Sequence, residues 1–206
     1  MTYPAAQGGR LEKFMNIILA SGSPRRHELL RDAGIEHTVM PANADESLPD
    51  GVSPKEAVKI LAERKARAAV RLIEPDIDGC VIIAADTLVS CGGTIYGKPK
   101  DKSEAFRMLS SLTGGCHSVQ TGVCVTNGED FLTEAEESLV YMRKAEDYEI
   151  RSYIDRYLPL DKAGAYGIQE AAGLLVSRIE GDYSNIVGLP LCRTGIMLSK
   201  FGVRLF

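Results

Sequence analysis

Apolar residues fall into short continuous runs that are separated by turn residues. The runs at 17–20 and 80–85 are apolar throughout, a pattern typical of strands that are buried on both faces. Shorter stretches at 36–40 and 174–179 also predict strands, and 181–185 after them is typical of a turn. Strands of this kind in a chain that also contains helical patterns indicate an α/β fold with a mixed, twisted sheet.

Two further strands are predicted at 118–126 and 130–142, because Asn127-Gly128 between them is a strong hairpin signal. We expect this hairpin to form a separate antiparallel wing, and therefore the second lobe of the fold. A tighter hairpin is expected at Gly92-Gly93, which returns the chain through 94–96.

Apolar residues at a helical period predict helices after Ser23, Ser53 and Asp101, and over 147–158 and 191–201. Ser53 and Asp101 are each followed three residues later by Glu, which is the pattern of a capping box. These helices are expected to flank the sheet. The apolar stripe predicted for the long helix after Ser53 consists of Ala57, Ile60, Leu61, Ala68 and Leu72.

The chain of 206 residues is long enough to bury a substantial core. We expect a single domain over 15–206 whose two lobes enclose a central cleft. Residues 1–14 are largely polar and lack periodicity, so we expect a disordered leader or a tag there. No apolar run approaches the ~20 residues of a membrane span, and the first residues lack the order of a signal peptide. These features predict a cytoplasmic protein that has no membrane partner.

The balance of 24 Lys and Arg against 28 Asp and Glu makes the net charge −4. General nucleic-acid-binding proteins rely on a net basic face to displace counterions, so this balance argues against that class. A small anionic ligand needs only a local cluster of cations. The five cysteines are an odd number without Cys-x-x-Cys spacing, which argues against a disulfide framework and a zinc site. We expect them to be small buried apolar residues.

The strongest candidate for an anion site is the turn after the first strand, at 21–26. Ser23 can accept a backbone N–H as the N-cap of the next helix, and Pro24 suits the first helical position. Backbone N–H groups and the positive end of the helix dipole then face the turn, with Arg25 and Arg26 beside it. A phosphate group is the expected guest, and two solvated arginines in a surface turn are the ordinary alternative.

Other candidates lie near the ends of predicted strands. Asp86 directly follows the run 80–85, and α/β proteins tend to place reactive groups at such strand ends. An Asp that caps a loop is the alternative. Its neighbour Thr87 has a hydroxyl that can donate and accept. Lys98 lies between a glycine and a proline, from where its ammonium group could be directed into the same crevice.

Three more polar residues are open to two interpretations. Glu46 lies in a polar loop, Lys65 on the long helix, and Gln169 at the end of the glycine-rich stretch 161–169. Each residue type is more often solvated than bound to a ligand. Gln169 nevertheless offers both a donor and an acceptor, beside a backbone that its glycines allow to pass close to a ligand.

Four motifs occur in the order found in one known family. They are Ser-x-Ser-x-Arg-Arg at 21–26, Ala-Ala-Asp-Thr at 84–87, Gly-Lys-Pro at 97–99 and Asp-Lys-Ala-Gly-Ala-Tyr-Gly-Ile-Gln at 161–169. With these motifs, the chain from Asn16 onward resembles the Maf family of nucleoside triphosphate pyrophosphatases. The resemblance implies a Maf/ITPase-like fold. It also implies hydrolysis of a nucleoside triphosphate between its α and β phosphates, which produces the monophosphate and pyrophosphate.

The same resemblance implies roles for the candidate residues. Asp86 would be the proton acceptor that activates water, with Glu46 and Lys98 also in the catalytic group. Glu46 and Asp86 would hold a divalent cation, Mg²⁺ or Mn²⁺, because carboxylates and substrate phosphates suit these hard cations. The implied substrate-binding residues are Ser21, Ser23, Arg25, Arg26, Lys65, Thr87 and Gln169.

The stretch 161–169 looks like the branch of the family that acts on dTTP and UTP, and the implied role is removal of non-standard or excess pyrimidine nucleotides. Arg25, Thr87 and Gln169 fall on the family's specificity positions. The chain departs from this branch directly after Gln169, where Glu170 replaces the usual glycine. A homodimer is an expectation that comes from the family alone.

Two other functions stay open on the sequence. The family's association with septum formation suggests a regulator that binds nucleotide with little turnover. A phosphatase, in contrast, would release only the terminal phosphate. Retention of both Asp86 and Lys98 favours turnover.

Overall fold

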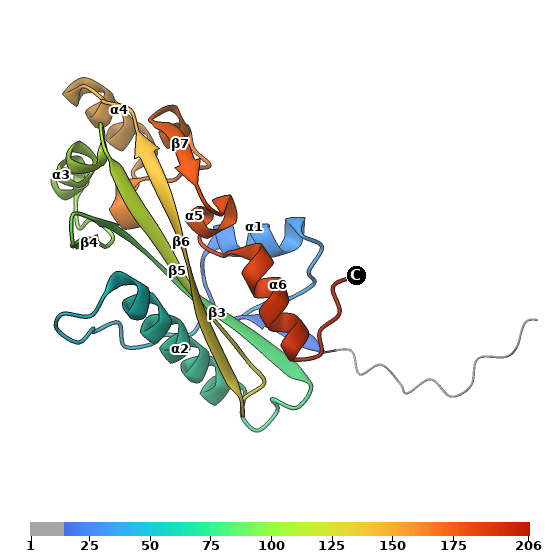
Figure 1. The fold of residues 1–206 in the computed structure, drawn as a ribbon. Helices are drawn as coiled ribbons and strands as arrows, with labels where there is room; N and C mark the ends of the chain where they lie inside the picture. Colours follow the sequence, from blue (N-terminus) through green and yellow to red (C-terminus); the bar gives the residue numbers. More distant parts are fainter. Residues whose placement is uncertain (1–14) are drawn as a thin grey trace, which may run out of the picture.

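The computed structural model describes residues 15–206, whose strands form one mixed, 7-stranded sheet (Figure 1). The predicted leader or tag at 1–14 lies outside the described residues. The strand order is β2-β1-β3-β5-β6-β7, and β4 also pairs with β3. β1 is parallel to both of its neighbours, and the other pairs are antiparallel. The strands are β1 (Asn16–Leu19), β2 (Thr38–Val39), β3 (Cys80–Cys91), β4 (Thr94–Tyr96), β5 (Cys116–Thr126), β6 (Phe131–Met142) and β7 (Val176–Glu180).

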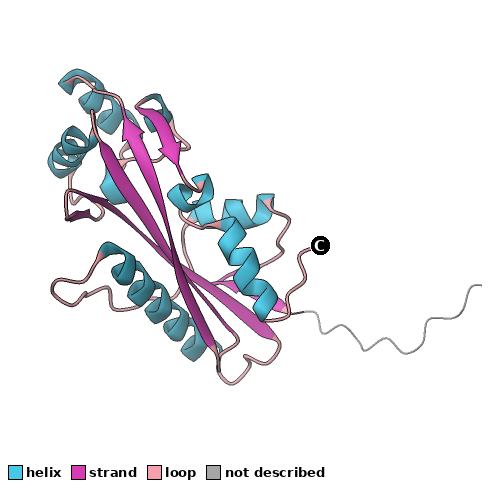
Figure 2. Ribbon diagram, in the orientation of Figure 1, coloured by secondary structure: helices cyan, strands magenta, loops and turns pink. Residues whose placement is uncertain are grey.

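Helices cover both faces of this sheet, with α2 on one face and α1, α5 and α6 on the other (Figure 2). This arrangement confirms the predicted α/β class with a twisted sheet flanked by helices. Within residues 15–206, none of the helices has the length and apolar content needed to cross a membrane. The helices are α1 (Pro24–Asp32), α2 (Pro54–Ile73), α3 (Lys102–Leu112), α4 (Asp147–Tyr157), α5 (Tyr183–Val187) and α6 (Leu191–Lys200), with 3₁₀ turns η1 (Ala163–Ala165) and η2 (Ala171–Leu174).

The pleat of β3 distributes its side chains between the two faces. Ile83 and Ala85 pack in one apolar cluster with residues of α1 and α6, whereas Ala84 packs in another with alanines of α2. Because side chains alternate along a strand, Asp86 lies on the α2 face and Thr87 on the α1 face. These two sequence neighbours therefore serve opposite faces of the sheet.

The hairpin of β5 and β6 is central to the sheet, so the prediction of a separate antiparallel wing is wrong. β5 pairs with β3 all the way from Ile82 to Ser90. The hairpin signal identified the connection between the two strands correctly, but a local signal carries no information on the third strand that a hairpin joins. A third apolar cluster, with Leu109 of α3 and Ile150 of α4, covers the start of β5 and the end of β6.

Helix α2 packs closer to the sheet than its predicted stripe suggested. Leu72 is 63% exposed, and the helix instead buries small residues such as Ala62 and Ala66. A Cβ atom on Gly122 of β5 would lie 2.2 Å from the backbone oxygen of Val58. The helix backbone therefore rests directly on the strand, a contact that only small residues permit.

Three smaller predictions also need correction. The segment predicted as a turn at 181–185 continues into helix α5. Of the cysteines, Cys124 is buried whereas two are exposed, so a buried apolar role is wrong for most of them. Ser53 and Asp101 cap their helices as predicted. The carboxylate of Glu104, however, accepts the N–H of Lys100 and does not complete a capping box.

Candidate active site

The candidate site lies where the sheet has an open edge. On one side of β3, strand β1 pairs only as far as Leu19 opposite Ile83, and β4 joins the same edge from Val89 onward. Among the described residues, 84–88 have no strand partner on this edge, while β5 pairs with them on the other. The motif residues Asp86 and Thr87 lie in this gap. Asp86 is therefore inside a long strand, which corrects its predicted position at a strand end.

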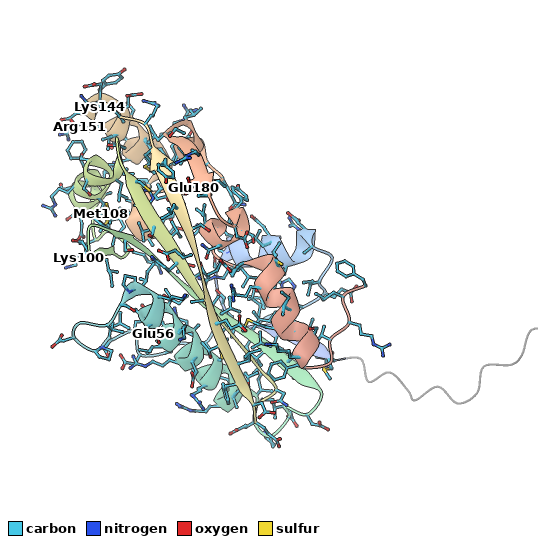
Figure 3. The ribbon with its side chains drawn as sticks, viewed as in Figure 1. Glu56, Lys100, Met108, Lys144, Arg151 and Glu180 are labelled. Carbon is cyan, nitrogen blue, oxygen red and sulfur yellow. The ribbon has the colours of Figure 1, made fainter. Side chains whose placement is uncertain are left out.

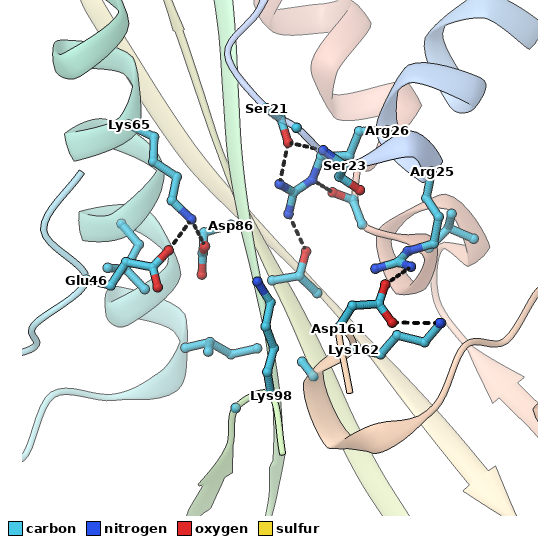
Figure 4. Close-up of a pocket in the computed structure, with 18 of the residues that line it drawn as sticks. Ser21, Ser23, Arg25, Arg26, Glu46, Lys65, Asp86, Lys98, Asp161 and Lys162 are labelled. Atoms are coloured by element: carbon cyan, nitrogen blue, oxygen red, sulfur yellow. Dashed lines mark hydrogen bonds and ion pairs between the residues drawn. The ribbon is translucent and has the colours of Figure 1, made fainter. Parts of the chain in front are cut away.

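A cavity of about 1310 Å³ opens at this edge. It lies between the turn after β1, the loop before α2, helix α2 itself, the residues after β4 and the stretch 161–169 (Figure 4). The residues predicted from the sequence all line it, namely Ser21, Ser23, Arg25, Arg26, Glu46, Lys65, Asp86, Thr87, Lys98 and Gln169. Segments far apart in the sequence thus converge on one concave surface, which is the usual setting of a small-molecule site.

One side of the cavity, which we call the α2 wall, consists of Glu46, Lys65 and Asp86. The ammonium of Lys65 contacts Asp86 Oδ1 at 2.5 Å and Glu46 Oε1 at 2.9 Å. The side chains of Lys65 and Asp86 are only 16% and 13% exposed. The hydrogen bond and charge of Lys65, with a smaller contribution from Lys98, hold the pKa of Glu46 below its ordinary value. Both carboxylates are therefore directed toward one cation.

The close packing of α2 places Lys65 within reach of Asp86. Asp86 pairs directly with Gly122 across the sheet, so both residues lie on the face that α2 covers. Since Gly122 has no side chain, α2 approaches the sheet at this level. Lys65 and Leu61 are one helical turn apart and both line the cavity.

Arg26 is held in a polar network on the opposite face of β3. Its guanidinium donates to the carbonyl of Gly188 at 2.7 Å, and to the hydroxyls of Ser21 and Thr87, each at 3.0 Å. The Thr87 hydroxyl is also 2.9 Å from that of Thr121. Desolvation lowers the pKa of Arg26 to about 10 against the opposing effect of Asp86, so the side chain stays cationic at neutral pH. Arg26 is thus a fixed positive charge within the lining.

The turn after β1 has the predicted helix start but not the predicted cap. Ser23 is the N-cap position of α1, with Pro24 next to it, yet its hydroxyl makes no capping hydrogen bond. Its backbone N–H donates to the hydroxyl of Ser21 at 3.3 Å. Ser21 therefore binds both this N–H and Arg26, which ties the turn to the guanidinium. The Ser23 hydroxyl lines the cavity without a capping role.

The other side of the cavity, which we call the loop wall, consists of Arg25, Asp161, Lys162 and Gln169, and Glu170 adjoins it through an ion pair with Lys162. Arg25 donates to Asp161 Oδ2 at 3.1 Å. Partial burial raises the pKa of Asp161, but hydrogen bonds from Lys162 and Arg25 outweigh this effect and hold the pKa below its ordinary value. Asp161 thus links helix α1 to the stretch 161–169.

Several polar side chains of the cavity, including those of Lys98 and Gln169, have no partner among residues 15–206. The amide of Gln169 and the ammonium of Lys98 make no hydrogen bond or ion pair there, and Gln169 is exposed. Figure 4 shows the Lys98 ammonium directed into the space between Asp86 and Arg26. Both groups are therefore free to contact a ligand.

The sequence reasoning did not identify Asp161 and Lys162 as site residues, although both lie inside a motif that it singled out. Lys162 is only 7% exposed. The signal in the sequence was the adjacent pair Asp161-Lys162 in an otherwise apolar, glycine-rich stretch. Charged residues are rarely buried unless they are paired, so such a pair indicates an ion-pair network.

The carboxylates of the cavity suit a divalent cation only in part. No cluster of three or more His, Cys, Asp or Glu side chains suited to a metal occurs in the described part of the chain. Glu46 and Asp86 do converge on the same ammonium group. Mg²⁺ commonly uses one or two carboxylates together with substrate phosphates, so this pair fits an ion that arrives with a nucleotide.

Comparison with known proteins adds a family to this geometry. Residues 16–201 match the family described as Maf-like protein. A dTTP/UTP pyrophosphatase of Caldicellulosiruptor bescii is 48% identical over 188 residues, covering 90% of this chain and 94% of that protein. A dTTP/UTP pyrophosphatase of Geotalea uraniireducens is 48% identical over 189 residues, covering 91% of this chain and 95% of that protein. The Ham1 protein of Staphylococcus aureus superposes with a TM-score of 0.43 at 17% identity, with 78% and 90% covered.

Proposed function

This chain belongs to the Maf family, and from that premise we propose that it hydrolyses dTTP and UTP between the α and β phosphates. The products are the nucleoside monophosphate and pyrophosphate. The observation that carries the proposal is that Asp86 faces a cavity which is also lined by Arg25, Lys65 and Lys98. Support for the substrate class comes from relatives named dTTP/UTP pyrophosphatase that are 48% identical over nine-tenths of the chain.

Cationic side chains of the cavity bind the phosphates. A triphosphate carries about four negative charges, and charge-assisted hydrogen bonds from Arg and Lys are the strong ones for such groups. Lys98 has no ion-pair partner among the described residues, so it binds phosphate without breaking a contact. Arg26 keeps its three hydrogen bonds and contributes a fixed charge. Ser21 and Ser23 shape the turn that receives the phosphate.

Asp86 is the proton acceptor for the attacking water. Its carboxylate lies on a rigid strand and is held in place by the ammonium of Lys65, so it is positioned to accept a proton from a water in the cavity. A divalent cation, Mg²⁺ or Mn²⁺, held by Glu46 and Asp86, would neutralise charge on the phosphates. Lys65 keeps the two carboxylates together before the nucleotide binds.

Selection of the base belongs to the loop wall. The amide of Gln169 presents a donor and an acceptor, which match the O4 and N3–H groups of thymine or uracil. Thr87 acts indirectly, because its hydroxyl is already bound to Arg26 and Thr121. The resulting cellular role is removal of non-standard or excess pyrimidine nucleotides.

The test is a panel of nucleoside triphosphates, incubated with the protein and Mg²⁺, in which pyrophosphate and orthophosphate are measured separately. We expect pyrophosphate from dTTP and UTP and little product from purine nucleotides. Orthophosphate as the only product would show a phosphatase that removes the terminal group. A dTTP-dependent rise in melting temperature without any product would instead show a nucleotide-binding regulator, such as one that acts in septum formation.

A further inference from the structure

The ion pair between Lys162 and Glu170 spans the chain segment that carries Gln169 and has no role in the reaction just described. We propose that this pair is a positioning device, which holds the turn carrying Gln169 and thereby sets the preference for thymine and uracil. This inference rests on the proposed function. It assigns to Lys162 and Glu170 a part in substrate selection and no part in the chemistry.

Lys162 is a buried cation that needs its carboxylates. Its side chain is 8% exposed, and its ammonium contacts Asp161 Oδ1 at 2.8 Å and Glu170 Oε1 at 3.2 Å. A buried ammonium without an anion carries a large desolvation cost. Because Asp161 also binds Arg25, Glu170 is the carboxylate that Lys162 does not share with Arg25. The charges of these four side chains balance.

The stem of Lys162 also constrains the turn directly. A Cβ atom on Gly167 would lie 2.9 Å from Cε and 3.1 Å from Cδ of Lys162. The aliphatic chain therefore passes across the backbone of Gly167 on its way to Glu170. A side chain at 167 would therefore displace the stem of Lys162 from this path.

Gln169 sits at the tip of the turn that these contacts close. The N–H of Glu170 donates to the carbonyl of Gly167 at 3.0 Å, which brackets Ile168 and Gln169 in a four-residue turn. The N–H of Gly167 donates to the hydroxyl of Tyr153 at 3.3 Å. One end of the turn is thus held by the core, and the other by the ion pair.

The Gln169 side chain has no hydrogen bond of its own within residues 15–206, so only the turn fixes where its amide can reach. A hydrogen bond weakens steeply when its geometry is lost. If the turn moves, the amide no longer meets the base edge, whereas Asp86 and Lys65 are held by other elements. Loss of Glu170 should therefore lower base preference and affect turnover of a bound substrate much less.

The experiment measures kcat and KM for dTTP and dCTP in the wild type, Glu170→Ala, Glu170→Gln and Glu180→Ala. Glu180 is the matched control, because it is a carboxylate in an exposed pair with Arg178, at 2.9 Å, and lies at the end of β7 outside the cavity (Figure 3). We expect Glu170→Ala to lower the ratio of kcat/KM for dTTP to that for dCTP by about fivefold through KM, as for loss of one hydrogen bond. Glu170→Gln keeps a hydrogen-bond acceptor for Lys162, so its ratio should lie between those of Glu170→Ala and the wild type. The ratio for Glu180→Ala should match that of the wild type.

A double-mutant cycle with Gln169→Ala tests whether Glu170 acts through Gln169. In the Gln169→Ala background, Glu170→Ala should leave the dTTP to dCTP ratio unchanged. The inference would be overturned if Glu170→Ala kept the wild-type ratio of kcat/KM for dTTP to that for dCTP. It would also be overturned if Glu170→Ala lowered this ratio as much in the Gln169→Ala background as in the wild type. Absence of pyrophosphate from the wild type would refute the proposed function instead. The same variants would then be compared by the melting-temperature shifts that dTTP and dCTP produce, with the same expected order.

Discussion

The two walls of the cavity are built from different kinds of structure. The α2 wall stands mainly on regular elements, since Asp86 lies within the 12-residue strand β3 and Lys65 within the 20-residue helix α2. Its third residue, Glu46, lies in the loop before α2 and is held by its ion pair with Lys65. The loop wall consists of the helix start at Arg25 and of turns and 3₁₀ structure around 161–170. Its shape depends on ion pairs between side chains and less on a backbone ladder.

This difference matches the two tasks that the proposed function requires. Groups on helices and strands are held more accurately than groups on loops, and activation of water needs that accuracy. Recognition of a base suits the loop wall, because binding residues are commonly carried on loops that a rigid scaffold positions. Changes to the α2 wall should therefore alter the rate with every nucleotide, whereas changes to the loop wall should alter the choice among nucleotides.

The largest effect should come from Asp86→Asn. Loss of a positioned general base commonly costs about 10²–10⁴-fold in rate, and we expect a loss of that size in kcat with dTTP, UTP and dCTP alike. The assay is pyrophosphate release, with circular dichroism to show that the fold is kept. Activity within about threefold of wild type would remove Asp86 from its role. A loss with dTTP alone would break the proposed division between the walls.

The next effect tests what supports the α2 wall. In Gly122→Ala the new methyl group would lie 2.2 Å from the Val58 oxygen, so α2 must move away and take Lys65 with it. We expect the free energy of unfolding, measured in denaturant, to fall by roughly 1–3 kcal/mol, the range for overpacked cores. We also expect kcat to fall with all nucleotides. Gly115→Ala is the matched control, because its methyl group would meet its nearest atom only at 3.8 Å. Equal stability of both variants would contradict this account.

The stability of the fold should depend on pH through His117, which contacts a residue of the cavity lining. His117 is buried, and its Nε2 is 2.7 Å from the hydroxyl of Tyr166, which lines the cavity. Burial lowers the pKa of His117 from 6.5 to about 4. The unfolded chain therefore binds a proton at higher pH than the folded one, so stability falls as pH drops from 6.5 toward 4. The shift corresponds to roughly 3 kcal/mol.

Urea unfolding at several pH values, for the wild type and for His117→Gln, measures this effect. In the wild type the free energy of unfolding should fall between pH 6.5 and 4, and much of this fall should be absent in the variant. The glutamine amide can still form a hydrogen bond with Tyr166. The pKa of Glu46 is lowered from 4.5, so its contribution is lost only at the acid end of that range and below it. An identical slope in both proteins would show that burial of His117 does not control the stability of this region.

Local signals in the sequence predicted most of the elements, and the family motifs supplied most of the residues that line the cavity, although Asp161 and Lys162 were missed. The caps at Ser53 and Asp101 depend on residues only three positions away, and the motif residues all proved to line one cavity. The length of β3 was missed because Asp86 and Thr87 are polar. They face a cavity and a polar network, so the strand continues through residues that resemble a loop.

Contacts between distant segments were out of reach for the same kind of reasoning. The pairing of β3 with β5, the approach of α2 to Gly122 and the bridge from Arg25 to Asp161 each join residues far apart in the chain. No local period specifies such partners. The loop wall was the least predictable part, since its geometry depends on several side-chain pairs at once.

The smallest effect, and the sharpest test of the comparison, should come from Arg25→Lys. The Arg25 guanidinium, on a side chain 29% exposed, donates to Asp161, and its planar fork has further N–H groups for a phosphate. A lysine ammonium is a compact point charge that cannot reproduce this fork, so binding phosphate would release Asp161 and loosen the loop wall. We expect the preference for dTTP over dCTP to fall by about threefold, with kcat nearly kept, since exposed pairs are worth at most about 1 kcal/mol. Arg31→Lys, on the same helix and in an ion pair with exposed Asp32, is the control. A uniform loss with both nucleotides would mean that Arg25 is a plain phosphate contact, and that the two walls do not divide their tasks.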